Sequence, residues 1–265
     1  MKPKLSITTK QAIELGLCKE DQIWFDDEAW EVEEFSKLKD VKIDSDLILI
    51  GIKTLKTFPS GLKVGGDLKL FNCKSLKSIP SGLQVGGNLE LTDCTSLESL
   101  PSGLKVGGDL NLKGCTSLES LPSGLKVGGN LDLWDCKSLK SLPSGLKVDG
   151  DLDLRGCKSL KSLPQGLKVG GDLGLNYLEH LESLPSDLKV GGLLGLIDCT
   201  SLKTLPSGLQ VNKNLYLEGC TALESIPSDL KVGGNLYLWG CSSLKPLPSD
   251  LKVRGQISLP QHLEE

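Results

Sequence analysis

The sequence predicts a mostly β solenoid of stacked 21-residue coils. One face should carry a parallel β-sheet, the convex side should be extended and turn-rich, and a small, mainly helical cap should precede the stack. Three observations predict this fold. Proline recurs every 21 residues from Pro59 to Pro248 without insertion or deletion. Apolar residues recur at the same places of each unit, and no segment of the unit is long or periodic enough for a helix. A fixed period near 20 residues is typical of chains that grow by stacking.

We number the repeat from the leucine four residues before each proline. Nine full repeats then cover residues 55–243, inside a solenoid expected over residues 41–259 that includes a partial repeat at each end. Positions 1, 4, 8, 10, 14, 16 and 19 are apolar almost throughout. Because a single coil cannot bury its own leucines, stacked coils should place each leucine above its equivalent in a continuous core.

Each coil should contain one short strand. Positions 14 and 16, such as Leu110 and Leu112, alternate with polar residues, which is the pattern of a strand with one buried face. The glycine pair before this strand supplies backbone conformations that side chains resist. The proline lacks an N–H group and suits a turn or a strand edge. Stacked coils therefore form a parallel sheet with strands about 4.8 Å apart.

The stretch LDLRGCKSLKSLPQGL, residues 152–167, resembles a leucine-rich repeat in its L-x-L-x-x-C-x-x-L pattern followed by L-P-x-x-L. The form with cysteine resembles repeats of plant resistance receptors, and the short unit resembles bacterial and phage leucine-rich repeats. One departure is that Gly107 occupies the place of a usual leucine, with Val106 beside it. The resemblance implies a leucine-rich-repeat solenoid that serves as a non-catalytic scaffold for protein–protein interaction, or as the recognition part of a larger bacterial effector.

Three columns of identical residues run along the stack. Cysteine fills position 19 in eight repeats, and Leu178 replaces it once, so we expect buried, reduced thiols rather than disulfides, metal ligands or redox groups. Lysine recurs at position 9, where solubility is the simplest role and polyanion binding the minor alternative. Serine recurs at positions 3, 6 and 21, where turn hydrogen bonds compete with an ice-binding-like hydroxyl array.

Positions 15 and 17 point outward from the predicted strand and vary most from repeat to repeat; we call them the strand face. Six of the seven aromatic residues in the repeats lie at positions 15, 17 or 18. Exposed tryptophan and tyrosine on a rigid sheet typically anchor protein interfaces. The predicted partner-binding residues are Trp134, Arg155, Leu193, Ile197, Tyr216, Glu218, Tyr237 and Trp239.

The C-terminal half of the strand face offers the better patch. Tyr216 and Tyr237 occupy the same position in neighbouring repeats and should stack, with Trp239 beside them. Gly174 and Gly195 should leave a bare shelf below the tyrosines, into which a side chain or backbone segment of a partner could settle. The alternative role is a structural or surface-ordering solenoid, including an ice-binding-like one.

Residues 1–40 lie before the repeats, and we interpret them as an N-terminal cap that covers the first exposed rung and sheet edge. Thr9 is a candidate N-cap of a short helix that includes Ile13 and Leu17, and the stretch of residues 26–38 could form a second helix or a strand. Residues 260–265 form a short C-terminal tail.

The charge and residue composition of the chain limit the classes of function that it can have. The chain carries a formal net charge of −4, which gives no overall attraction to nucleic acid or membrane surfaces. The N-terminal residues contain no apolar run of signal-peptide length, so we expect a cytoplasmic protein, with delivery to a host cell as the alternative. The two histidines, His180 and His262, form no catalytic or metal-ligand pattern, and we expect neither an enzyme nor a cofactor. A monomer is expected, with end-to-end association as the alternative.

Overall fold

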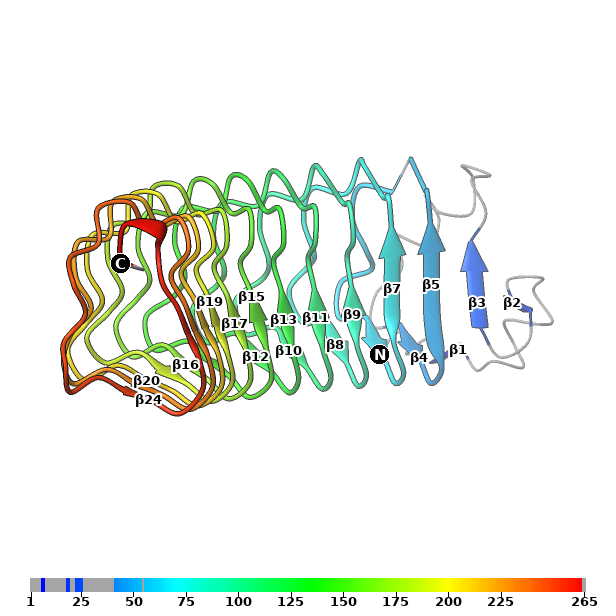
Figure 1. Ribbon diagram of the computed structural model, residues 1–265. Coiled ribbons are helices and arrows are strands. Elements are labelled where there is room, and N and C mark those ends of the chain that lie inside the picture. The colour runs from blue at the N-terminus through cyan, green and yellow to red at the C-terminus, as the bar shows by residue number, and fades with distance from the viewer. Residues whose placement is uncertain (1–5, 8–17, 20–21, 26–40, 54, 264–265) are drawn as a thin grey trace. The chain divides into compact units, whose positions relative to one another are not determined.

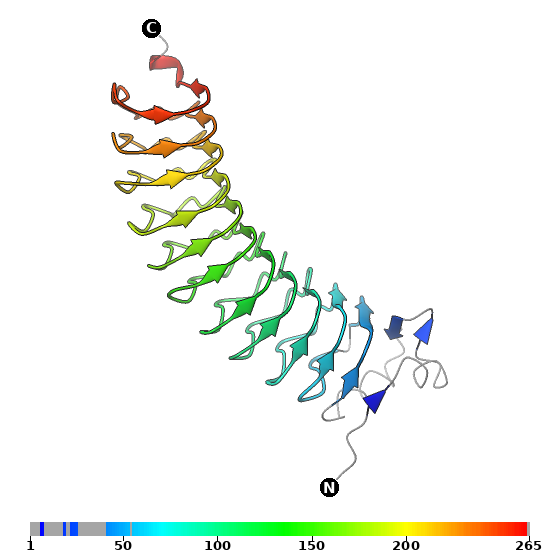
Figure 2. The same ribbon diagram turned by 90° about the horizontal axis from the view of Figure 1, so that it is seen from below.

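The computed structural model describes residues 6–7, 18–19, 22–25, 41–53 and 55–263. Its contacts divide the chain into two compact units, residues 1–132 and residues 133–265. Each unit is a parallel-strand β-solenoid, and its coils lie side by side along the unit (Figures 1 and 2). The predicted fold class is thereby confirmed for the repeats.

Two parallel sheets run along each unit. The leucine sheet contains strands at positions 14–15 of the repeat, and the lysine sheet contains strands at positions 9–10. In the first unit the leucine sheet has the order β2-β3-β5-β7-β9-β11-β13 and the lysine sheet the order β1-β4-β6-β8-β10-β12. The strands of this unit are β1 (Ser6–Ile7), β2 (Cys18–Lys19), β3 (Gln22–Phe25), β4 (Lys42–Ile43), β5 (Asp46–Ile50), β6 (Lys63–Val64), β7 (Leu68–Phe71), β8 (Gln84–Val85), β9 (Leu89–Glu90), β10 (Lys105–Val106), β11 (Leu110–Asn111), β12 (Lys126–Val127) and β13 (Leu131–Asp132).

The second unit repeats this plan. Its leucine sheet has the order β15-β17-β19-β21-β23-β25, and its lysine sheet has the order β14-β16-β18-β20-β22-β24. The elements are β14 (Lys147–Val148), β15 (Leu152–Asp153), β16 (Lys168–Val169), β17 (Leu173–Gly174), β18 (Lys189–Val190), β19 (Leu194–Gly195), β20 (Gln210–Val211), β21 (Leu215–Tyr216), β22 (Lys231–Val232), β23 (Leu236–Tyr237), β24 (Lys252–Val253), β25 (Ile257–Ser258) and the 3₁₀ helix η1 (Gln261–Leu263). The helix η1 lies in the tail, where His262 Nε2 is 2.9 Å from the Leu244 carbonyl oxygen.

The strands pair in a register of one repeat. Leu110 pairs with Leu131 in the leucine sheet, and Lys105 pairs with Lys126 in the lysine sheet. Equivalent residues therefore stack, and the leucines at positions 14 and 16 are fully buried in every full repeat. Burial of a leucine side chain stabilises a fold by about 1.5–3 kcal/mol, so the repeated leucines drive the stacking. The apolar pattern of the sequence predicted this core correctly.

The lysine sheet is a feature that the sequence analysis missed. The segment GLKVGG was expected to form a turn and an extended stretch, whereas its Lys–Val pair forms a parallel strand. Valine at position 10 is buried in every full repeat, while lysine at position 9 is exposed. A strand of two residues offers only one step of alternation, which is too short a pattern to distinguish a strand from a loop.

The predicted helices of the N-terminal cap lie outside the described residues. The short segments of residues 1–40 that the structure describes are strands, because β1 pairs with β4 and β3 pairs with β5, both in parallel. These strands extend both sheets beyond the first repeats, and the N-terminal cap of residues 1–40 stays a prediction.

Position 18, directly after the leucine strand, adopts a left-handed backbone. Glycine, asparagine or aspartate fills it in most repeats, for example Asn72 with φ of 56° and Gly114 with φ of 72°. These residue types tolerate positive φ, whereas other side chains lose about 1–2 kcal/mol there. Tyr177 is the exception, with φ of 66° and a side chain that is 48% exposed.

We expect Tyr177→Asn to raise the free energy of unfolding by about 1 kcal/mol, because asparagine relieves the left-handed strain and little buried surface is lost. Thermal or urea unfolding measures the change. Asp198→Asn, at the same position one repeat later, is the matched control and should be nearly neutral. A lower melting temperature for Tyr177→Asn would show that the tyrosine ring supports the fold.

Candidate partner-binding face

A hydrogen-bond ladder borders the strand face. At position 13, the Oδ1 atom of an aspartate or asparagine accepts the backbone N–H of position 13 in the next repeat. The bond from the Asp109 amide to Asn88 Oδ1 is 2.8 Å long, and the bond from the Asp172 amide to Asp151 Oδ1 is 2.7 Å. The ladder satisfies amides that precede each leucine strand and aligns neighbouring coils.

The ladder explains the glycine at position 12. A Cβ atom built on Gly108 would lie 2.1 Å from Asn88 Oδ1, and one built on Gly234 would lie 2.3 Å from Asn214 Oδ1. Lys213 is the exception at position 12, and it follows the repeat in which Leu193 replaces the ladder residue. A leucine cannot accept the Asn214 amide, so its presence both interrupts the ladder and makes room for the lysine side chain.

Two tyrosines form the centre of the face in the second unit. The rings of Tyr216 and Tyr237 are stacked, with centroids 4.7 Å apart and planes within 5°. Asn214 Nδ2 donates to the Tyr216 hydroxyl and Asn235 Nδ2 to the Tyr237 hydroxyl, each over 2.9 Å. The predicted stack is confirmed, and the ladder asparagines hold both rings in place.

Two tryptophans lie at position 17 of the same unit. Trp239 is 66% exposed, and Trp134 is 39% exposed with the Arg155 guanidinium carbon 5.0 Å from its ring centroid. Of the five large apolar side chains that are exposed in the described residues, four lie at position 17 or 18. They are Ile50, Trp134, Tyr177 and Trp239; the fifth, Ile257, lies on the last leucine strand. Apolar exposure is therefore concentrated beside the leucine strands.

A hollow of about 380 Å³ lies on the strand face below the tyrosines. Gly174 and Gly195 form part of it, because neither contributes a side chain at position 15. Its lining is Asp151, Leu152, Asp153, Arg155, Asp172, Gly174, Asn176, Leu193, Gly195, Ile197 and Tyr216. The hollow occupies the place predicted for the bare shelf, and it brings together four of the predicted residues: Arg155, Leu193, Ile197 and Tyr216.

Glu218 lies at position 17 between Ile197 of the repeat before and Trp239 of the repeat after. Its Oε2 atom is buried and has no hydrogen-bond partner among the described residues. A buried carboxylate oxygen without a donor is costly. Glu218 therefore places a carboxyl group between two apolar side chains of the strand face.

The acidic rim and the ladder were only partly visible in the sequence. Asp151, Asp153 and Asp172 line the hollow but were not among the predicted binding residues. The recurrence of aspartate or asparagine at position 13, always followed one repeat later by glycine at position 12, was the available signal. Trp239, Tyr237 and Trp134 do not line the hollow but lie on the same face of the unit.

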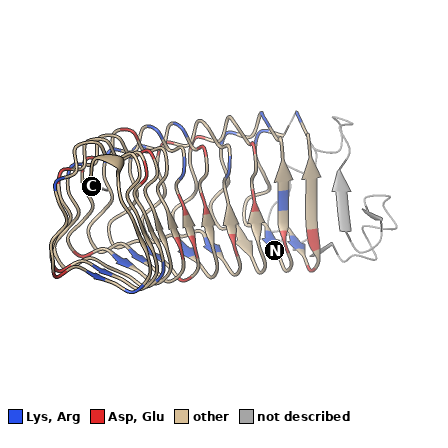
Figure 3. Ribbon diagram, viewed as in Figure 1, with Lys and Arg blue, Asp and Glu red and all other residues tan. Residues whose placement is uncertain are grey.

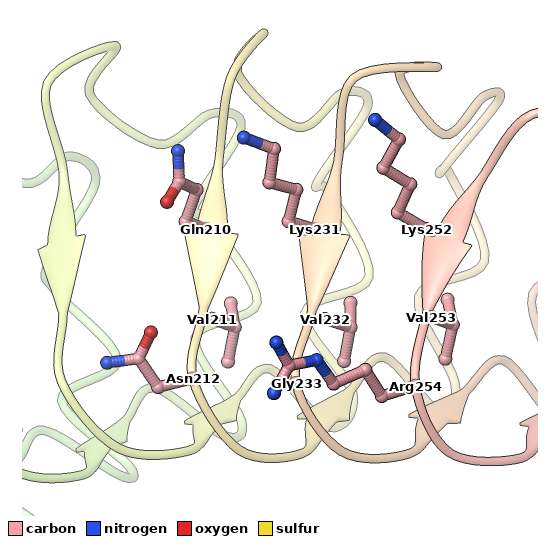
Figure 4. A pocket seen from close by; sticks show the side chains of 9 residues that line it. All are labelled: Gln210, Val211, Asn212, Lys231, Val232, Gly233, Lys252, Val253 and Arg254. Atoms are coloured by element: carbon pink, nitrogen blue, oxygen red, sulfur yellow. The ribbon is translucent and has the colours of Figure 1, made fainter.

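A second hollow, of about 480 Å³, lies on the lysine sheet of the second unit (Figure 4). Lys231 and Lys252 extend in the same direction from β22 and β24, and Arg254 reaches over Gly233. Asp229 lies two residues before Lys231. Hydrogen bonds from the Gly208 amide and the Ser207 hydroxyl lower the pKa of the Asp229 carboxyl, and the charge of Lys231 lowers it further. The charged residues that line the hollow are the cations Lys231, Lys252 and Arg254, and Asp229 is not among them. Figure 3 shows the lysine strands in blue along each unit.

The cysteine column lies in the core. None of the eight position-19 cysteines forms a disulfide, and all eight are fully buried. Their thiols point to carbonyl oxygens of the preceding repeat, as in the 3.1 Å contact from Cys115 Sγ to the Leu91 oxygen. Burial raises the pKa of Cys115 and Cys199 to about 12 and that of Cys241 to about 11.

We expect the eight column thiols of the native protein to resist a thiol reagent even at pH 9, where an ordinary cysteine with a pKa of about 8.5 is mostly thiolate. Because the folded pKa values of Cys115, Cys199 and Cys241 lie above the unfolded ones, these three thiols contribute stability that is complete below about pH 8.5 and is lost as the pH rises towards 12. Labelling before and after denaturation measures the protection. Rapid native labelling of most thiols would contradict it.

The described residues contain no group of three or more histidine, cysteine, aspartate or glutamate side chains arranged to hold a metal ion. Among these same residues, no helix has the length and apolar character needed to cross a membrane. His180 is exposed at a repeat turn, and His262 contacts a backbone carbonyl.

Two solved structures are similar to this chain. One is the crystal structure of a leucine-rich repeat protein from Bacteroides ovatus, with 16% identity and a TM-score of 0.35 over 79% of this chain and 74% of that one. The other is the leucine-rich repeat domain of the type III effector XopL, with 20% identity and a TM-score of 0.31 over 97% of this chain and 82% of that one. No family model matches the sequence, and no curated protein matches it. The 21-residue repeat and its stacked parallel coils fit the leucine-rich-repeat family.

Proposed function

We propose that this protein is a non-catalytic scaffold that binds a protein partner on the strand face of its second unit. The observation that supports this most is a hollow on that face next to two stacked tyrosines and a tryptophan that is 66% exposed. Interfaces are enriched in tyrosine, tryptophan and arginine, and their anchors pack in or around pockets.

The two tyrosine rings of the face are held by hydrogen bonds, which favours recognition. Leucines on either side of each outward residue are fully buried, and the ladder asparagines hold the two tyrosine hydroxyls. A partner therefore meets side chains that are already ordered and loses little conformational entropy in fixing them. The predicted residues Trp134, Arg155, Leu193, Ile197, Tyr216, Glu218, Tyr237 and Trp239 make up this proposed site.

The sequence of the ladder also supports a binding role. Leu193 interrupts a hydrogen-bond ladder that stabilises the other coils, yet it adds an apolar side chain to the hollow. A residue that lowers stability but builds a surface is common at functional sites. A purely structural or ice-binding-like solenoid would gain nothing from this interruption.

Buried free thiols suit a reducing compartment, so we propose a cytoplasmic setting, either in the source cell or in a host cell that receives the protein. The test of the function is affinity capture with two baits, the wild-type chain and the Tyr237→Ala/Trp239→Ala variant. A partner retained by the first bait and lost from the second supports the proposal. Equal retention by both baits would contradict it, and binding through the lysine sheet would become the better explanation.

A further inference from the structure

We infer that the hollow on the strand face takes a basic side chain, lysine or arginine, from the protein partner. This inference rests on the proposed function, because it names the chemistry of the group bound at the same face. The aliphatic stem would lie on Leu193, Ile197 and the Tyr216 ring, and the charged head would lie at the acidic rim.

The charges of the rim favour a cation. Three carboxylates line the hollow, and the one cation in its lining is Arg155. Arg155 is held by one of them, since its Nε atom lies 2.9 Å from each carboxylate oxygen of Asp153. The other two carboxylates, Asp151 and Asp172, lie one repeat apart in the ladder.

The chain itself places a lysine head at this rim. The Nζ atom of Lys213 lies 3.2 Å from Asp172 Oδ1, although the two residues are two repeats apart. The ion pair is solvent-exposed on the lysine side, so its contribution to stability is small. Two of the three rim carboxylates, Asp153 and Asp172, therefore already hold the head of a basic side chain.

The floor of the hollow suits an aliphatic stem. Gly174 and Gly195 contribute no side chains there, while Leu193 and Ile197 provide apolar surface. Lysine and arginine bury their methylene groups on such surface while the charged head reaches polar groups. The Tyr216 ring adds a face over which a cation is attracted.

Other kinds of side chain would fit the hollow less well. A carboxylate would meet Asp151 and Asp172, and like charges across an interface cost several kcal/mol. A purely apolar side chain would remove water from these carboxylates without replacing its hydrogen bonds. A basic guest satisfies both the apolar floor and the acidic rim.

The experiment uses the chain of residues 1–265 and two small probes that differ in charge, Nα-acetyl-arginine amide and Nα-acetyl-citrulline amide. Two-dimensional amide NMR follows the Gly174 and Gly195 resonances during each titration. We expect the arginine probe to bind at least fivefold more tightly than the citrulline probe. Lys213→Gly, which restores the usual residue of position 12, removes the competing ammonium and should tighten arginine binding further.

Asp151→Asn/Asp172→Asn is the decisive variant, because asparagine keeps the ladder oxygen and removes only the charge, as Asn88 and Asn214 do in other repeats. It should abolish the preference for arginine. The matched control is Asp109→Asn, the same change at a ladder position of the first unit, and it should leave the preference intact.

Equal binding of the two probes, absence of shifts at both glycines, or an equal loss in the Asp109→Asn control would overturn the inference. The proposed function would survive each of these results if truncation of Tyr237 and Trp239 still removed the captured partner. Conversely, the hollow could prefer the arginine probe while the partner still binds the variant that lacks Tyr237 and Trp239. That result would refute the proposed function and support the cation site.

Discussion

Alanine at Gly108 should lower the free energy of unfolding by about 2 kcal/mol. The added Cβ atom would lie 2.1 Å from Asn88 Oδ1, so the ladder oxygen must move away. The Asp109 amide then loses its 2.8 Å hydrogen bond, and a partly buried amide without an acceptor costs about 1–3 kcal/mol. Urea unfolding of the variant and the wild-type chain measures the difference.

The control for this prediction is a double-mutant cycle at the interruption of the ladder. Leu193→Asn alone should destabilise the protein, because the new oxygen meets the Lys213 side chain. In the background of Lys213→Gly the same change should stabilise it, because the ladder becomes continuous and the Asn214 amide gains an acceptor. A coupling energy near zero between the two changes would contradict the explanation that a ladder oxygen at position 13 and a side chain at position 12 of the next repeat cannot occupy the same space.

The core of the fold could be predicted from the sequence because the same leucine contacts recur between every pair of neighbouring repeats. Each leucine at position 14 or 16 meets its own equivalent one repeat away, as in the pairing of Leu110 with Leu131. A one-residue error in register would expose every leucine, so the apolar pattern and the period together determine the stacking.

The second sheet and the ladder could not be predicted in the same way. The lysine strand is only two residues long, and its valine alone does not distinguish a strand from a turn. The ladder depends on the distance between a side-chain oxygen and an amide one repeat away. That distance follows from the coil geometry and not from the identity of Asn88 or Asp109 taken singly.

The parts of the candidate site that depend only on a residue's position in the repeat could be predicted from the sequence. The stack of Tyr216 on Tyr237 and the space over Gly174 and Gly195 both follow from residues that share a column. The acidic rim was missed because Asp151 and Asp172 lie at position 13, outside the outward positions 15 and 17. Their place at the edge of the hollow depends on Gly174 and Gly195, which leave position 15 of two neighbouring repeats without a side chain.

The largest functional effect should come from the aromatic residues. We expect Tyr237→Ala/Trp239→Ala to weaken partner binding by about 30-fold or more, because a central aromatic anchor typically contributes about 2 kcal/mol or more. The Trp239 side chain is mostly exposed and the Tyr237 ring lies on the outer face, so the leucine core should remain intact. Loss of the Tyr stack should lower the melting temperature only slightly.

The central claim is that a protein partner binds the strand face of the second unit, and calorimetric titration of the captured partner tests it most directly. The titration compares three folded chains: the wild type, Tyr237→Ala/Trp239→Ala, and Lys69→Ala/Glu90→Ala, which removes a 3.3 Å ion pair from the strand face of the first unit. We expect affinity to fall by about 30-fold or more for the aromatic variant and by less than threefold for the ion-pair variant. Unchanged affinity for the aromatic variant, with the fold intact, would contradict it.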